Sequence, residues 1–591
     1  MGGRTNFWKH TSALLALAAI VAGSFAPLAL GQEVKQKAKD TKAKGTKAKD
    51  PKAKDKESAA AGTSDYGIPQ IREINQQIAA VWKDNGLTPS PQASDSEWCR
   101  RVFLDVLGRV PTVPELRDFT SDKNADKKLQ LVEKLLNGEE YNGEYARNWT
   151  TIWTNILIGR NGGMEDNTLI SRAGMQKYLR DSFARNKPYD RMVYELVSAT
   201  GGTSPGSPNF NGATNFLVMK LDEGAAQATA MTAKHFLGLQ VQCTQCHNHP
   251  FNEWKQQKFW DMNAFFKQTR ALRKFAPGTR DVASAELVNQ DFAGDTGDPN
   301  EADVSYELRN GRMQVAYPVF IDGTEISKSG YVTENDRRTR LGELIIQSPY
   351  LDKTIANRTW AHFMGYGFTK PIDDMGPHNV PTHPQLLDYL GKEIRKNSFN
   401  LKELMKWIVL SEPYSLSSKI TAGNKADDPL LGETPKFTHF YLRQMRAEEL
   451  YESLVIATQA EKTKGSYEEQ EKMKADWLKQ FVIAFGTDEG DETTTFNGTI
   501  PQVLMMFNGD LVKKATSPDQ GSFVHQLANN GGIKPVDKIN YLFMAGLARP
   551  PSQNELLAAQ QLAATHKGNG VAAMEDIWWA VLNSNEFIMN H

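Results

Sequence analysis

The chain has little cysteine. Its 591 residues include only Cys99, Cys243 and Cys246. So few thiols exclude a fold held together by disulfide bonds, which is the usual device of small secreted domains. Cys99 lies in an apolar, helix-like context, so we predict a buried thiol without a bonding partner.

Long apolar runs are absent after residue 30, since no later stretch approaches the roughly 20 residues that a bilayer span requires. The N-terminus differs, because Arg4 and Lys9 precede an apolar stretch that continues to Leu30. This order is typical of a secretory signal peptide, and we predict one over residues 1–31; an uncleaved membrane anchor is the alternative. The predicted mature chain is exported to the periplasm or cell surface and has no transmembrane span.

Residues 32–65 lack the apolar side chains of a folded core. Between residues 33 and 57 ten lysines stand against five acidic residues. We predict a disordered linker here, either a solvated spacer or a contact to the cell wall or envelope. Without this linker (+5) and the leader (+2) the formal net charge falls from −1 to about −8, which argues against a nucleic-acid partner.

Familiar catalytic motifs are also missing: we find no serine nucleophile elbow, phosphate-binding loop or zincin motif. Sequence repeats of solenoid length are absent as well, so a repeat array is not expected. What the chain does have is apolar spacing typical of helices, over residues 71–82, 98–107, 129–136, 386–394, 401–410 and 450–456. A capping box from Thr112 to Glu115 predicts one helix start, and Asn137-Gly138 predicts one helix end.

Turn and loop signals divide the chain into two predicted domains and an insert. Short alternating runs around Asn310-Gly311 predict a small antiparallel insert between Val304 and Tyr331. Loops are predicted over 201–212 and 277–300. The predicted fold is mainly α, with two helical domains and a small antiparallel β insert between them. The expected limits are 66–275 for the first domain, 276–335 for the loop and insert, and 336–591 for the second.

One motif carries most of the chemical information. Residues 243–247 read Cys-Thr-Gln-Cys-His, the spacing that attaches a c-type haem through two thiols, with the histidine as iron ligand. We predict Cys243, Cys246 and His247 as cofactor-binding residues. A helix is expected over 225–242, with His235 and Cys243 on one stripe of it.

Other interpretations of this motif stay open. Zinc or iron is the alternative cofactor, with Cys243, Cys246, His247 and His249 as ligands and His235 as an additional candidate, although zinc sites usually draw their ligands as two pairs from separated segments. A thiol-disulfide exchange site, a structural disulfide and two buried thiols are further possibilities. The aromatic residues after the motif either wall a porphyrin or form ordinary helix core. The candidates for a sixth haem ligand are His249, Met262, His362, Met375 and His378.

A second polar cluster occurs in the C-terminal half, and its members are Asn357, Arg358, His362, Asp373, Asp374, His378 and His383. Such a set suits a metal or acid-base site, with His362 and His378 as candidate metal ligands. The structural interpretation is that the two aspartates cap a helix or pair with Arg358.

The chain resembles a known pair of families. Residues 70 to about 270 resemble the planctomycete cytochrome-c-like domain of unknown function, and residues 336 to about 590 resemble its usual C-terminal companion. The motifs that carry the likeness are residues 87–95, 100–111, 243–251, 357–368, 371–378, 382–384 and 410–414. The resemblance implies export and, from the family's name, a cytochrome-like role for Cys243, Cys246 and His247. Many relatives carry a separate cytochrome module in front of this pair, where this chain has its lysine-rich segment.

Three functions follow as hypotheses. The first is an exported protein that carries a c-type haem, with a redox or electron-transfer role and a protein redox partner. The second is a metal-dependent enzyme or hydrolase acting on extracellular polymer. The third is an envelope scaffold without catalysis. The sequence leaves open whether the protein is an enzyme.

Overall fold

The structure is a computed structural model that describes residues 64–250, 252–458 and 515–591, with five isolated residues between 459 and 514. The predicted signal peptide and nearly all of the predicted linker lie outside these residues. The fold is mainly helical, as predicted. Within the described part, no helix is both long and apolar enough to cross a membrane.

The first half consists of helices joined by short turns. Its helices are α2 (Pro69–Asp84), α3 (Asp95–Leu107), α4 (Val113–Ser121), α5 (Lys127–Asn137), α6 (Glu139–Ile158), α7 (Arg172–Ala184), α8 (Tyr189–Ser198), α9 (Asp222–Thr232) and α10 (Gln256–Asn263). Single helical turns connect them, namely η1 (Gly212–Phe216), η2 (Ala233–Leu237), η3 (Gln242–Gln245) and η4 (Ala264–Phe266).

The second half continues in the same way. Its helices are α11 (Arg337–Gln347), α12 (Pro349–Met364), α13 (Pro384–Lys396), α14 (Leu401–Val409), α15 (Ala447–Ala457), α19 (Phe523–Asn529), α20 (Pro535–Leu547), α21 (Gln553–Thr565), α22 (Gly570–Leu582) and α23 (Asn585–Ile588), with the short turns η5 (Pro413–Ser415) and η6 (Pro429–Leu431). Strands β6 (Arg443–Gln444) and β7 (Met589–Asn590) pair antiparallel, so the C-terminal residues lie beside the segment that precedes α15.

All six predicted helices are present, because their apolar spacing gives each one a buried face. In α2, for example, Ile71, Ile74, Ile78 and Trp82 are buried. The capping box is also confirmed. Thr112 Oγ1 accepts from the N–H of Glu115, and the Glu115 carboxylate accepts from the N–H of Thr112.

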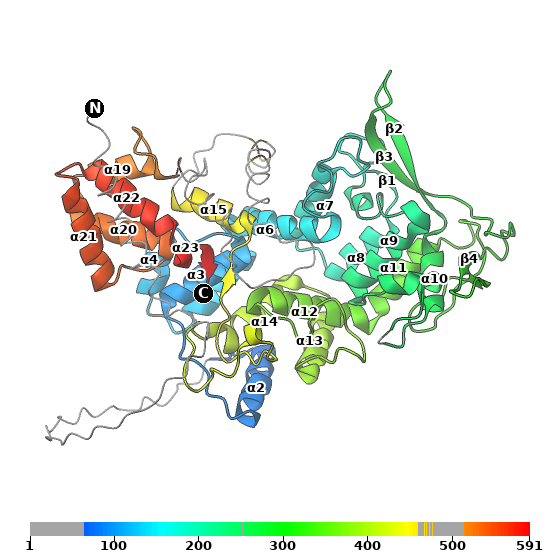
Figure 1. Cartoon of the computed structure of the whole chain (residues 1–591), viewed down its shortest axis with the longest axis horizontal. Coiled ribbons are helices and arrows are strands. Elements are labelled where there is room, and N and C mark those ends of the chain that lie inside the picture. Colours follow the sequence, from blue (N-terminus) through cyan, green and yellow to red (C-terminus); the bar gives the residue numbers. More distant parts are fainter. Residues whose placement is uncertain are drawn as a thin grey trace, which may run out of the picture.

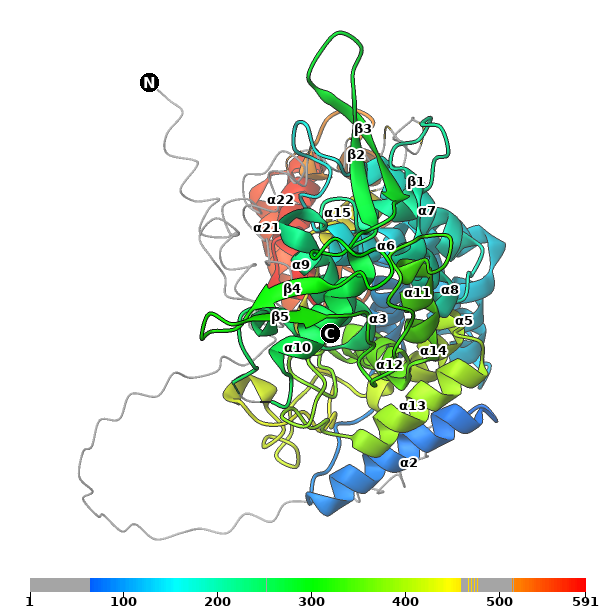
Figure 2. The ribbon, with the colours of Figure 1, turned by 90° about the vertical axis from the view of Figure 1, so that its right-hand side faces the viewer.

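The β structure is larger than predicted. The hairpin around Asn310-Gly311 is confirmed as β4 (Val304–Glu307) and β5 (Met313–Ala316), which pair antiparallel. The prediction of a loop over 277–300 is wrong in part, since β3 (Val282–Asn289) lies inside it. β3 pairs with β2 (Thr269–Phe275) and β1 (Gly201–Gly202) in the order β1-β3-β2, and the β2–β3 hairpin projects from the helices (Figure 2). The glycine and aspartate content that predicted the loop belongs to the turns at both ends of this strand.

Two large hydrophobic cores and two small clusters organise the described residues. The largest core takes side chains from both halves, from Ile71 in α2 to Ala548. The second core joins α15 and α19–α23 to three residues near the end of α3 and the start of α4 (Figure 1). The predicted domain limit near residue 335 therefore does not separate the cores, because burial follows the packing of helices rather than their order.

The corner between α3 and α4 is held by an arginine. Arg109 forms two hydrogen bonds of 2.9 Å to the carboxylate of Glu115 and also pairs with Glu144. Before it, Gly108 takes a left-handed conformation with φ of 75°. The guanidinium thus ties the start of α4 to the side of α6.

The corner between α20 and α21 repeats this design. Arg549 bonds both carboxylate oxygens of Glu555 at 2.9 Å and pairs with Glu586, and Ser552 caps α21 where Thr112 caps α4. The sequences Leu-Gly-Arg-Val-Pro-Thr over 107–112 and Leu-Ala-Arg-Pro-Pro-Ser over 547–552 share the leucine, the arginine and the proline before the cap, and both end in a hydroxyl residue. The same arrangement of an arginine paired with the third residue of a capped helix therefore occurs at two helix corners.

Candidate functional site

The Cys-Cys-His motif lies on an exposed loop. Cys243 is on the turn η3 and Cys246 follows it, and both thiols are free and exposed. Two side chains fix the loop to α10, because Trp260 Nε1 and Gln256 Nε2 donate to the Gln245 carbonyl at 3.1 and 3.2 Å. The alternative of two buried thiols is therefore wrong for this pair.

The predicted helix over 225–242 is present but ends earlier than predicted. α9 has left-handed backbone angles at Glu223, Gly224 and Ala225, and the helix changes to a π-helical turn, η2, before it ends at Gly238. Gly238 has φ of 64° and lies against the 371–376 segment, where a Cβ would collide with Met375. The predicted stripe from His235 to Cys243 is broken at this glycine. The two residues consequently belong to different parts of the site.

The orientation of His247 suits a metal ligand. Its Nδ1 lies 2.7 Å from the carbonyl oxygen of Asn248. Since a carbonyl only accepts, the proton is on Nδ1 and the lone pair of the neutral ring is on Nε2. Histidine ligands typically hold the ring in this way, with the second nitrogen donating to a carbonyl. The donor set of Cys243, Cys246 and His247 therefore fits a c-type haem.

A segment of the C-terminal half lies against this loop. The Met375 N–H donates to the Gly238 carbonyl at 2.6 Å, and Gln240 Nε2 donates to Asp373 Oδ1 at 2.8 Å. The motif of residues 371–378 thus meets the motif of residues 243–251, although more than one hundred residues separate them. The structure brings the two strongest motifs of the sequence to one place.

Two of the predicted metal ligands become neighbours through this contact. The rings of His249 and His378 are 5.8 Å apart, and His378 Nε2 lies 3.0 Å from Asp374 Oδ2. Burial and the neighbouring His378 lower the pKa of His249, which keeps the His249 ring neutral near pH 7. Across the described residues, no group of three or more His, Cys, Asp and Glu side chains is arranged to hold a metal ion. We call Cys243, Cys246, His249, Asp374 and His378 the rim cluster.

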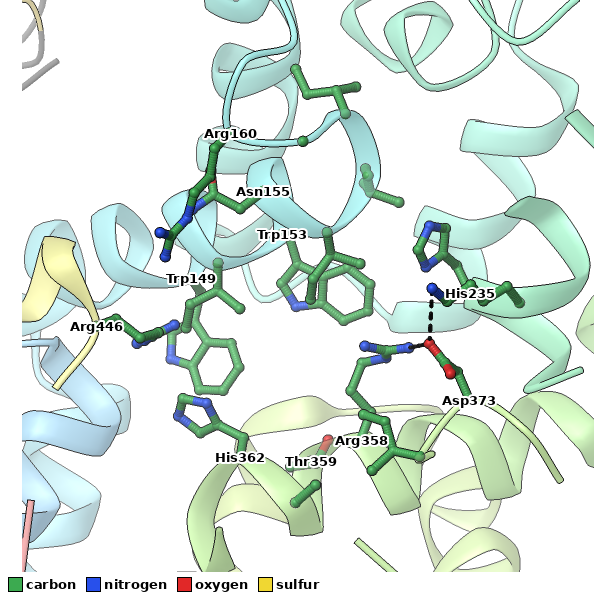
Figure 3. Close-up of a pocket in the computed structure, with 18 of the residues that line it drawn as sticks. Trp149, Trp153, Asn155, Arg160, His235, Arg358, Thr359, His362, Asp373 and Arg446 are labelled. Atoms are coloured by element: carbon green, nitrogen blue, oxygen red, sulfur yellow. Dashed lines mark ion pairs between the residues drawn. The ribbon is translucent and has the colours of Figure 1, made fainter. Parts of the chain in front are cut away.

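The other two predicted histidines line a cavity behind the loop. The cavity has a volume of about 700 Å³ and lies between α6, α12, η2 and residues 443–449 (Figure 3). His235 forms part of the wall on η2. His362 packs on Trp149 with ring centroids 4.9 Å apart, and its Nε2 lies 3.0 Å from the Asp105 carbonyl. Burial lowers the pKa of both histidines well below the usual value, so both rings are neutral at pH 7.

Asp373 joins the rim cluster to this cavity. Its Oδ2 lies 3.6 Å from Lys234 Nζ and 3.8 Å from Arg358 Nη2, and Figure 3 shows these contacts beside His235. The predicted pairing of this aspartate with Arg358 is confirmed. Asp374, the next residue, faces His378 instead. The two consecutive carboxylates therefore lie in different surroundings, one in the cavity and one in the rim cluster.

Two members of the predicted polar cluster have structural roles. Asn357 donates to Thr369 Oγ1 and to the Ile372 carbonyl, both at 2.9 Å, so it shapes the loop that leads to Asp373. His383 packs between Phe368 and Phe437, and burial lowers its pKa to about 4. These residues support the site rather than line it.

The residues after the motif form core. Phe259, Phe265 and Phe266 are fully buried among other apolar side chains. The helix-core interpretation of this run is therefore confirmed for these three residues. Met262 and Met375 are also buried, so of the candidate sixth ligands His249 and His378 are the ones that lie beside the motif.

Sequence reasoning missed most of the cavity wall. Trp149, Trp153, Arg160, Lys220 and Lys234 all line it. They come from α6, from the loops after α6 and before α9, and from η2, so no local pattern groups them. The spacing of Trp149 and Trp153 by four residues on one helix face is the only sequence signal, and it is equally typical of core.

Comparison with known families confirms the predicted domain order. Residues 73–271 match PSCyt2, described as a protein of unknown function (DUF1549), and residues 337–479 match PSD1, described as a protein of unknown function (DUF1553). No curated protein and no solved structure matches the chain. The rim cluster takes Cys243, Cys246 and His249 from the first domain and Asp374 and His378 from the second.

Proposed function

We propose that this chain, in which a PSCyt2 domain precedes a PSD1 domain, is an exported redox protein that carries a c-type haem on Cys243, Cys246 and His247. The observation that supports it best is the exposure of the two motif thiols together with the orientation of the histidine that follows them. Both thiols are free and exposed on one short turn, and the adjoining imidazole carries its lone pair on Nε2. A periplasmic or cell-surface location follows from the N-terminal sequence.

Attachment needs no reactant beyond the haem itself. Cys243 and Cys246 would hold the haem through thioether bonds to its two vinyl groups, and addition of an S–H group across a vinyl group is redox-neutral. Exposed thiols are suited to this addition because an assembly factor can reach them. When bound, the haem supplies one-electron redox chemistry.

The chain's own residues define the surroundings of the haem. His247 is held by the Asn248 carbonyl, and the loop is held by Trp260 and Gln256. Because Cys243 and Cys246 are exposed, a protein redox partner can reach the attachment loop. His249 and His378 are the side chains placed to influence the iron from the protein side.

The test is covalent haem on protein expressed in a periplasm with active maturation machinery. We expect wild type and Cys99→Ala to stain for haem in a denaturing gel and to show one haem mass by intact-mass spectrometry. The double variant Cys243→Ala/Cys246→Ala should show neither signal. His247→Ala should keep the adduct but change the visible spectrum, because the ligand and the attachment points are separate groups. Unstained wild type, or a double variant that keeps covalent haem, would refute the proposal.

The rim cluster also favours a second candidate, a metal-dependent enzyme acting on extracellular polymer. The described residues hold no preformed metal site, but His249, His378 and Asp374 lie close together. Asp373, next to Asp374, lines a cavity large enough for a small ligand or a chain end. Protein that stains for no haem but contains stoichiometric zinc or iron, lost in His378→Ala, would support this candidate instead. If the protein contained neither haem nor metal, the remaining hypothesis would be an envelope scaffold without catalysis.

A further inference from the structure

The cavity behind the rim cluster has the size of a ligand site. Its volume of about 700 Å³ falls within the range of 300 to 1,000 Å³ that is usual for small-molecule pockets. Two tryptophans of α6, Trp149 and Trp153, form part of its wall (Figure 3). Neither family description assigns it a role.

One end of the cavity is electrostatically balanced. Arg443 pairs with Asp105, Arg446 pairs with Glu449 at 2.6 Å, and Arg160 lies 3.3 Å from Glu448. Each guanidinium at this end therefore has its own carboxylate. This end offers no net charge to a ligand.

The other end carries excess positive charge. Lys220, Lys234 and Arg358 line it together with one carboxylate, Asp373. Lys234 and Arg358 share this carboxylate at 3.6 and 3.8 Å, which is beyond hydrogen-bond distance. Lys220 Nζ lies at the same end, where it donates to the carbonyls of Leu157 and Phe216 at 2.9 and 2.7 Å.

Polar atoms at this end lack hydrogen-bond partners. The Nε and Nη2 atoms of Arg358 and the Nδ1 atom of His235 are buried and make no hydrogen bond within the part of the chain that the structure describes. Leaving a buried polar group unbonded costs about 1–3 kcal/mol, and more for a charged one. Burial first, and then the charges of Arg358, Lys220 and Lys234, lower the pKa of His235, in agreement with an excess of cations here.

We infer that the cavity is a binding site for a small organic oxyanion, with the carboxylate or sulfate group at Arg358 and Lys234 and the uncharged body along Trp149 and Trp153. The planar guanidinium of Arg358 offers two unbonded donors to two oxygens of one group, a geometry that favours such anions over neutral molecules. Asp373 competes with the ligand for both cations. The site is independent of the haem motif, which lies on the exposed side of Asp373.

The experiment measures binding to the full mature chain by calorimetry and by tryptophan fluorescence. The probes are glucuronate, glucose 6-sulfate, inorganic sulfate and, as the neutral counterpart, glucose. We expect one of the two anionic sugars to bind at least about 10-fold more tightly than glucose, since hydrogen bonds to charged groups contribute about 1.5–3 kcal/mol. A preference for glucuronate identifies a carboxylate ligand, and a preference for glucose 6-sulfate identifies a sulfate ester.

Three variants make the test specific. Arg358→Gln should weaken the preferred probe by about 10-fold or more, whereas Lys353→Gln, on the same helix but exposed and paired with Asp388, should leave it unchanged. Asp373→Asn should tighten binding, because it removes the competing carboxylate; a merely structural role would not produce a gain. Anionic probes that bind no better than glucose, equal effects of Arg358→Gln and Lys353→Gln, or weaker binding in Asp373→Asn would each overturn the inference. Should Arg358→Gln fail to fold, the affinity of Asp373→Asn for the preferred probe decides: tighter binding supports the inference and weaker binding overturns it.

Discussion

The rim cluster and the cavity lie on opposite sides of two consecutive residues, yet they are built differently. Asp374 pairs with His378 beside the loop that carries the two thiols, and Asp373 lines the cavity with its arginine and lysine. The loop takes its three haem-binding candidates from five consecutive residues. The cavity takes its wall from elements spread between Asp105 and Glu449. A site made by one short segment is visible in the sequence, whereas a site made by packing is not.

The difference in exposure gives the largest expected effect. In protein produced without haem, Cys243 and Cys246 should react rapidly with a thiol reagent, because both are exposed. Cys99 is fully buried, and burial raises its pKa well above the usual value, so it should react at least about 100-fold more slowly, after local unfolding. Time-resolved titration of thiols on wild type and on Cys99→Ala measures this. Equal reaction rates for all three thiols would contradict the difference in exposure between the loop and the core.

The two aspartates provide a matched pair for stability. Asp373→Asn leaves Lys234 and Arg358 facing each other in a mostly buried place, and we expect a loss of about 2 kcal/mol in unfolding free energy, between the values for exposed and buried pairs. Asp374→Asn removes one contact to a histidine at the rim and should cost less than about 1 kcal/mol. Denaturant titration of both variants checks the order. If Asp374→Asn were the more costly change, the rim would be the structural part of the site.

The third comparison concerns pH and contrasts an enclosed histidine with a rim histidine. Burial lowers the pKa of His383 to about 4, whereas an unfolded histidine titrates near 6.5. The unfolded state therefore binds more protons between these values. His383 lowers the unfolding free energy by about 1.4 kcal/mol for each pH unit of acidification below 6.5, until about pH 4.

The measurement is the slope of unfolding free energy against pH from 7 to 4.5. His383→Phe should flatten this slope, because it removes the buried titrating ring while keeping its contacts with Phe368 and Phe437. His249→Phe should flatten it less, because His249 is only partly buried at the rim. Identical slopes in wild type and His383→Phe would contradict the assignment of His383 as a buried neutral group.

The local features of the fold were predictable. The capping box at Thr112, the helix end at Asn137-Gly138 and the hairpin at Asn310-Gly311 each depend on hydrogen bonds or backbone angles within a few residues. Strand β3 was missed because its flanking turns dominate the composition of residues 277–300. The helix over 225–242 was extended too far because spacing alone does not reveal that Gly238 must lie against Met375.

By itself the sequence determined the helical character, the helix ends and the motif of Cys243, Cys246 and His247, since all of these depend on side chains close together along the chain. It also determined the order of the two families. Only the tertiary structure decided that His378 and Asp374 join the motif, that His235 and His362 turn away from it, and that Arg358 faces a cavity. The physical reason is that burial and charge depend on neighbours in space. Those neighbours come from segments hundreds of residues apart, which pack together only when the apolar faces of the helices are removed from water.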